Sequence, residues 1–111
     1  MTVNQLMKEL NLKLIAGNDG LDNEISGGYC GDLLSWVMGR AQSGDAWITI
    51  MGNLNAIAVA VLADVSCIIL AENASCDDDA KARADLEGVP VLSTEEQAYP
   101  IAVKLSKLLG I

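Results

Sequence analysis

The chain has 111 residues, 7 of them Lys or Arg and 15 Asp or Glu, so its formal charge is −8, and it contains no His. This length fits a single domain over residues 1–111, and the missing His excludes Ser-His and Cys-His nucleophile pairs and the commonest metal ligand. The acidic balance argues against a nucleic-acid partner, because a phosphate backbone is bound by a basic face.

The N-terminal residues predict a helix followed by a strand. A capping-box pattern at Thr2 and Gln5, followed by apolar residues at helical spacing, predicts a short helix over residues 3–10. Residues 12–15 predict a first strand, and the turn-forming cluster at 17–20 ends it.

The next segment predicts a strand, a helix and a second strand. A weak strand within 23–29 leads into a glycine-rich turn at 27–32, which precedes a helix over 32–41. We expect Asp32 in the first turn of this helix, where negative charge is favourable. The β-branched residues of 46–51 then predict a strand.

Alternation of helix and strand continues through the second half. Asn53 is expected to cap a buried helix over 54–63, although the alternating Ala and Val residues leave a strand as the lesser option. Residues 66–70 predict a core strand. The acidic residues 77–79 are typical of a solvated helix start rather than a calcium loop, and Gly88 is expected to end that helix.

The C-terminal residues predict a short strand over 89–92 and a last helix. Overlapping capping boxes within 93–97 are expected to begin this helix, and Pro100 to kink it or to mark a restart whose main body is 101–109. Strand and helix thus alternate from about residue 46, which predicts right-handed βαβ units and a largely parallel sheet.

Two loops are candidate ligand contacts. The glycine-rich turn at 27–32 could bring backbone N–H groups close to an anion, but it lacks the Lys and Ser or Thr of a P-loop, and a plain strand-to-helix turn is the simpler interpretation. The second candidate is the end of the next strand and the helix start after it, with Thr49, Asn53 and Asn55, and a structural cap is the alternative role for Asn53. Because ligands gather at the carboxyl ends of parallel strands, we expect the two loops to converge on one pocket.

The cysteines and tryptophans have mainly structural interpretations. Cys30 is thiolate-prone if it lies near a helix N-terminus, but we favour a buried, inert thiol for it and also for Cys67. Trp36 and Trp47 are expected in the core or at a subunit contact, with stacking on a ligand base as the alternative. No nucleophile–base pair or metal cluster is evident, so we expect no catalytic residue, no metal and no cofactor.

The location is expected to be the cytoplasm. The longest apolar stretch, residues 56–71, carries Asp64 and is expected to be protein core rather than a membrane span. Residues 1–5 lack the basic start of a signal peptide. Three cysteines leave one unpaired whatever the pairing, which suits a reducing compartment.

Several sequence blocks resemble small stand-alone DRTGG-domain proteins, and the resemblance covers nearly the whole chain from about Leu12. The blocks that carry it are residues 29–38, 44–49, the Ala-Val run that begins at Asn55, 67–69 and 88–92. This resemblance implies a fold like the N-terminal domain of HPr kinase/phosphorylase. That fold is a three-layer α/β/α sandwich with a small, largely parallel or mixed sheet.

The chain also departs from the family pattern. No Asp-Arg pair occurs near Tyr29, and Ala71-Glu72-Asn73 stands where a Thr-Gly-Gly-like turn would be expected. Asn53 stands where similar proteins tend to carry a His.

The resemblance also implies a function. In related phosphotransacetylases and pyrophosphatases the domain is a dimerising and regulatory part, and in the pyrophosphatases it lies beside adenine-nucleotide sites on CBS domains. Stand-alone members are similar to proteins encoded with bacterial hydrogenase and redox systems. We therefore expect a non-catalytic regulatory or ligand-sensing domain that acts as a homodimer, with an adenine nucleotide-like ligand or a redox or kinase partner protein.

The alternative function is a protein–protein interaction module that binds no small molecule and docks on its partner through an apolar face. For the ligand-sensing function, the residues expected to contact the ligand are Gly28, Tyr29, Asp32, Thr49, Asn53 and Asn55.

Overall fold

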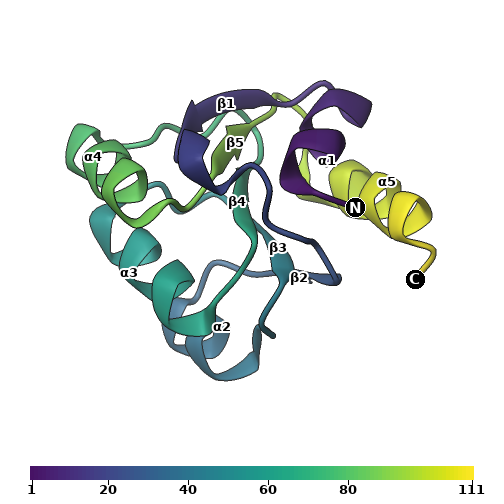
Figure 1. Ribbon diagram of the computed structural model, residues 1–111. Helices are drawn as coiled ribbons and strands as arrows, with labels where there is room; N and C mark the ends of the chain where they lie inside the picture. Colours follow the sequence, from purple (N-terminus) through teal and green to yellow (C-terminus); the bar gives the residue numbers. More distant parts are fainter.

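A five-stranded mixed sheet runs through the middle of the computed structural model, which describes residues 1–111 (Figure 1). The strand order is β1-β5-β4-β3-β2, and β2 to β5 are parallel, whereas β1 is antiparallel to β5. The strands are β1 (Lys13–Ala16), β2 (Gly27–Cys30), β3 (Asp45–Thr49), β4 (Cys67–Leu70) and β5 (Val91–Ser93).

Helices cover both faces of this sheet. On one face lie α1 (Val3–Glu9) and α5 (Ala98–Leu109), and on the other lie α2 (Leu34–Arg40), α3 (Leu54–Ala63) and α4 (Asp78–Glu87) (Figure 1). A 3-10 turn, Asn18–Gly20, follows β1. The predicted three-layer α/β/α sandwich with a mixed sheet is thereby confirmed. None of the helices is long and apolar enough to cross a membrane.

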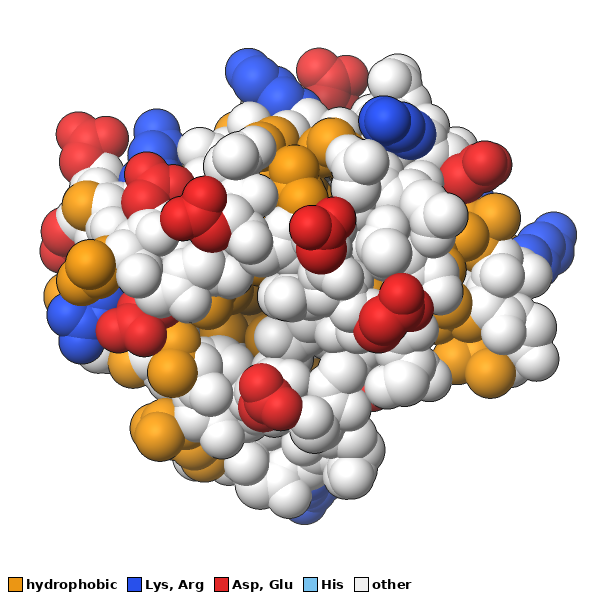
Figure 2. Space-filling model, viewed as in Figure 1, with side chains coloured by type: hydrophobic (Ala, Val, Ile, Leu, Met, Phe, Trp, Pro, Cys, Tyr) orange, Lys and Arg blue, Asp and Glu red, His pale blue; other side chains and the backbone are white.

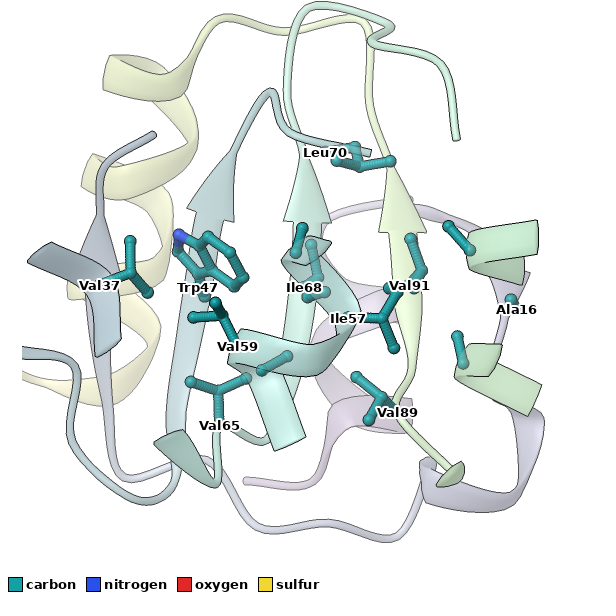
Figure 3. Packing of buried hydrophobic residues seen from close by; sticks show 14 residues of the cluster. Ala16, Val37, Trp47, Ile57, Val59, Val65, Ile68, Leu70, Val89 and Val91 are labelled. Carbon is teal, nitrogen blue, oxygen red and sulfur yellow. The ribbon is translucent and has the colours of Figure 1, made fainter. Parts of the chain in front are cut away.

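The core consists of two apolar clusters, one on each face of the sheet. Successive residues of a strand point to opposite faces. Trp47, Ile68 and Val91 therefore pack beneath Ile57 and Val59 of α3, as Figure 3 shows. Their strand neighbours pack against α1 and α5, and these are Ile48, Ile69 and Leu92. Both faces of β3 and β4 are thus buried, which explains why β4 and the middle of β3, residues 46–48, are apolar.

Local signals placed several helix ends correctly. The Thr2–Gln5 capping box begins α1, and the Asn53 side chain accepts a hydrogen bond from the Ala56 N–H at 2.9 Å at the start of α3. Gly88 ends α4 in the left-handed conformation, with φ of 67°. The predicted boundaries of the α3 helix, 54–63, match those of the structure.

The predicted start of the last helix was wrong. Gln97 precedes α5 without a side-chain cap, and the Thr94 hydroxyl instead accepts a hydrogen bond from the Glu96 N–H at 3.2 Å in the preceding turn. Pro100 is the third residue of α5, which runs unbroken from Ala98 to Leu109. The first-turn N–H groups of a helix have no partner within it, so a proline there removes no helical hydrogen bond.

The glycine-rich turn predicted at 27–32 is instead largely strand β2. Its residues pair in parallel with 45–48 of β3. The glycines fit this strand because a Cβ at Gly28 would lie 2.8 Å from Leu105 Cδ2 of α5, and one at Gly27 would lie 2.7 Å from Asp45 Oδ1. Gly27 and Gly28 therefore allow close packing around an edge strand.

Candidate functional site

The carboxyl ends of the four parallel strands meet at one edge of the sheet. The loops at 31–33, 50–53, 71–77 and 94–97 follow β2, β3, β4 and β5, and the start of antiparallel β1 lies at the same edge. In open α/β sheets this edge is where ligands bind.

Asp32 and Thr49 meet at this edge. The Thr49 hydroxyl, on a side chain that is 2% exposed, donates a hydrogen bond to Asp32 Oδ1 at 2.8 Å. The Ile50 N–H donates to the same oxygen at 3.0 Å. Asp32 precedes α2 and does not lie in its first turn, so that prediction was wrong, and the carboxylate joins the ends of β2 and β3 instead.

The six predicted ligand contacts do not converge on one pocket. Gly28 faces α5, whereas the next residue, Tyr29, packs against the cluster beneath α2 and α3, because alternate strand residues face opposite ways. Asn53 accepts the capping hydrogen bond described above, and Asn55 is exposed in the first turn of α3. Direct contact of these residues with a ligand stays a prediction.

Replacing Asp32 tests the link between the two strand ends. We expect Asp32→Ala to lower the free energy of unfolding by about 1–2 kcal/mol, because the buried Thr49 hydroxyl loses its charged acceptor. Asp32→Asn, which keeps an oxygen at the same place, is the matched control and should lose less than half as much. Urea unfolding followed by circular dichroism measures both variants. Equal losses in the two would contradict this role for the side-chain oxygen.

A groove that no sequence motif indicates lies at the same edge of the sheet, beside β1 and β5. One hollow of about 550 Å³ lies between Lys13, Asn73 and Lys104, and an adjoining hollow of about 320 Å³ extends it toward Lys81. Both hollows share Lys13, Asn73 and Ser93. We call this continuous depression the lysine groove, after Lys13, Lys81 and Lys104. Its lysines are isolated in the sequence, so no motif could have indicated it.

A smaller, apolar hollow lies on the α5 face of the sheet. It has a volume of about 140 Å³ and is bounded by Gly28, Leu105 and Ile111 among others. Gly28 is thus separated from the other predicted contacts by the thickness of the sheet.

The three thiols differ in accessibility. Cys30 is exposed because it lies on the edge strand β2. The prediction of a buried thiol at this position was therefore wrong. Partial burial and the nearby Asp32 carboxylate nevertheless raise the pKa of Cys30. Cys67 is buried, as predicted, and this burial raises its pKa to about 12. That it is inert stays a prediction. Burial raises the pKa of Cys76 as well.

These differences predict an order of reaction with Ellman's reagent. Cys30 should react first but more slowly at pH 8 than a free peptide thiol, because its raised pKa leaves less thiolate. Its rate should rise as the pH passes 9, and Asp32→Asn should accelerate it at pH 8. Cys67 should react only after unfolding. Modification of Cys67 in the folded protein at the rate of Cys30 would contradict the prediction.

The two tryptophans occupy opposite environments. Trp47 is fully buried, and its Nε1–H donates to the Gly31 carbonyl at 2.9 Å, which confirms a core role. Trp36 is 52% exposed, and the Arg40 guanidinium carbon lies 3.6 Å from the centre of its ring. A subunit contact through Trp36 stays a prediction.

The acidic residues 77–79 are exposed, and α4 begins at Asp78, as expected for a solvated helix start. The Asp78 carboxylate lies 3.8 Å from the Lys81 ammonium, one turn along the helix.

These features define a small three-layer α/β domain with its polar loops and its groove at the carboxyl edge of the sheet. Among solved structures, the fold is similar to the CBS and DRTGG domains of the regulatory region of Clostridium perfringens pyrophosphatase, complexed with the activator diadenosine tetraphosphate. The TM-score is 0.67 and the sequence identity 11%, so the likeness concerns the fold. The match covers 92% of this chain and 44% of that one, so this chain spans less than half the length of the similar structure.

The family follows from the sequence match. The DRTGG domain family matches residues 5–108, and the chain therefore belongs to this family. The resemblance carried by the blocks at 29–38 and 44–49 is thereby confirmed. Among curated proteins, no sequence matches the chain.

Proposed function

We propose that this chain is a non-catalytic regulatory domain that senses a small ligand in the cytoplasm and acts as a homodimer. Membership of the DRTGG family over residues 5–108 is the observation that carries the proposal. The similarity of its fold to part of a regulatory region supports it. A bacterial redox or hydrogenase system, or another metabolic system, is the setting that the sequence resemblance favours.

An adenine nucleotide-like molecule is the proposed ligand. The pyrophosphatase region of similar fold was solved with a dinucleotide activator. The proposed contacts at the β2 and β3 ends are Tyr29, Asp32, Thr49, Asn53 and Asn55, and Gly28 is a further proposed contact on the α5 face.

A thermal-shift screen against adenine nucleotides, dinucleotides, nucleosides and small acids tests ligand sensing. A ligand at 100 times its Kd stabilises the folded state by about 2.7 kcal/mol, which gives a clear rise in the midpoint. Asn55→Ala tests the proposed contacts, because Asn55 is exposed and makes no side-chain hydrogen bond within the chain. Unchanged midpoints with every compound would contradict ligand sensing.

Exposed apolar side chains support the proposed homodimer. Leu33, just before α2, is 58% exposed, and Trp36 within α2 is 52% exposed. Leu62 of α3 is 70% exposed and Leu86 of α4 is 77% exposed. Figure 2 shows apolar side chains at the surface over α3 and α4. Light scattering at micromolar concentration should give twice the chain mass of 11.7 kDa, and a monomer mass would contradict the homodimer.

The absence of catalysis is proposed on chemical grounds. The chain has no His to act as a general base near neutral pH. The pKa of each thiol is raised, and a raised pKa disfavours the nucleophilic thiolate.

An interaction module without a small ligand is the second candidate function. A shallow hollow of about 290 Å³ between α3 and α4, lined by Leu54, Arg83 and Leu86 among others, favours it. Such a module would give no thermal shift with any small compound, and Leu86→Glu would weaken its binding to a redox or kinase partner.

A further inference from the structure

The lysine groove concentrates positive charge in an acidic chain. Three of the 7 Lys and Arg residues line it, and they come from β1, α4 and α5. The chain as a whole has a formal charge of −8. Glu95 and Glu96 also line the wider hollow, whereas lysines are the only charged residues around the hollow between Lys13 and Lys81. A recess lined by one sign of charge raises the local concentration of ligands of the opposite sign.

Lys13 and Lys81 line the hollow of about 320 Å³ within the lysine groove, and no carboxylate lines that hollow. Lys13 forms no ion pair within the chain, and Lys81 lies 3.8 Å from Asp78, whose side chain is fully exposed to water. Ser93 lies directly opposite Lys13 in the β1–β5 register, and Ser75 of the β4–α4 loop also lines this hollow. Ammonium and hydroxyl donors together are suited to phosphate oxygens.

The wider hollow has a different character. Lys104 is held by the Glu96 carboxylate at 2.7 Å, and Asn11, Thr94 and Glu95 add amide, hydroxyl and carboxylate oxygens. These oxygens accept hydrogen bonds from hydroxyl or amino groups. The groove therefore has an anion-binding end and an end for hydrogen-bond donors.

Backbone hydrogen bonds fix the walls of the groove. The Glu72 N–H donates to the Glu96 carbonyl and the Asn73 N–H to the Thr94 carbonyl, both at 2.8 Å, which ties the β4–α4 loop to the β5–α5 loop. Asn11, Glu72 and Asn73 have φ of 53°, 57° and 54°, and they are three of the four non-glycine residues with positive φ. Such conformations cluster at ligand sites. A rigid groove loses little entropy when it binds.

We propose that the lysine groove binds a phosphorylated small molecule that also carries hydroxyl groups. Its phosphate lies between Lys13 and Lys81, and its hydroxyl-bearing part faces Asn11 and Glu95 in the wider hollow. The two hollows, at about 320 and 550 Å³, are within the range of about 300–1,000 Å³ typical of small-molecule sites. The inference rests on the proposed ligand sensing and gives it a ligand chemistry and a site in this groove, separate from the proposed contacts at the β2 and β3 ends.

Calorimetric titration of the full chain tests this site, with ATP and glucose 6-phosphate as phosphorylated probes and adenosine and glucose as their unphosphorylated counterparts. We expect at least one phosphorylated probe to bind, and Lys13→Gln/Lys81→Gln to weaken its binding by about tenfold or more. Lys8→Gln/Lys107→Gln removes the same charge from α1 and α5 outside the groove and is the matched control, expected to change affinity less than threefold. The two probes distinguish a nucleotide from a sugar phosphate.

Three results would overturn the inference. Equal affinity of a phosphorylated probe for both double variants would place the phosphate elsewhere. Equal affinity of the protein for adenosine and ATP would exclude phosphate recognition. Both results would leave ligand sensing intact. No binding of either phosphorylated probe at millimolar concentration would overturn the groove site, while the wider thermal-shift screen would decide ligand sensing separately. Thermal unfolding by circular dichroism establishes that each variant is folded.

Discussion

Trp47→Ala should lower the free energy of unfolding by about 3–5 kcal/mol, the range for removing a large buried aromatic side chain. The indole is fully buried beneath α3, and the mutation also removes the hydrogen bond from its Nε1–H to the Gly31 carbonyl. Natural domains have a total free energy of unfolding of about 5–15 kcal/mol, so this loss is a large part of the stability.

Trp36→Ala is the matched control for this experiment. Its ring is half exposed and contacts Arg40 through a surface cation–π interaction, which contributes about 0.5–1 kcal/mol. Urea unfolding followed by circular dichroism gives both values. Similar losses for the two tryptophans would mean that the packing beneath α3 does not dominate the stability.

Gly17→Ala should be nearly as damaging, with an expected loss of about 2–5 kcal/mol. Gly17 has a φ of 78°, a left-handed conformation that disfavours a side chain, and an added Cβ would overlap the backbone of Val89. Its N–H also donates to Asp85 Oδ1 at 2.7 Å, so a shift of the loop would disturb α4.

The control for Gly17 is the helical glycine Gly39. Nothing lies within 4 Å of a Cβ at this position, and alanine restricts the unfolded chain more than glycine does. Gly39→Ala should therefore raise the free energy of unfolding by about 0.5–1 kcal/mol. Thermal unfolding of both variants should show shifts of opposite sign, and a loss in Gly39→Ala would contradict the explanation.

Patterns that act over a few residues predicted most of the fold. The capping box at Thr2 and the Asn53 cap set helix starts through local hydrogen bonds, and apolar runs marked β3 and β4 because both of their faces are buried. The order of strand and helix then implied the parallel part of the sheet. The three-layer fold and the family were predicted from the resemblance of sequence blocks such as 29–38 and 44–49 to DRTGG-domain proteins.

Features that depend on contacts distant in sequence were missed. The role of Asp32 was mistaken because its partner, Thr49, is 17 residues away on the next strand. Gly28 was placed in a loop because the sequence does not indicate that Leu105 of α5 packs against it. The lysine groove depends on antiparallel β1 bringing Lys13 beside Ser93, and no local pattern specifies that pairing.

The sheet that separates the two apolar clusters has a consequence for combined mutations. Ile57 belongs to the cluster beneath α3 and Ile101 to the cluster beneath α5, with no shared cluster member. Effects at sites without shared partners add within about 0.5 kcal/mol. The losses for Ile57→Val and Ile101→Val should thus sum in the double variant. The stability of the α5 layer can therefore vary independently of the layer formed by α2, α3 and α4.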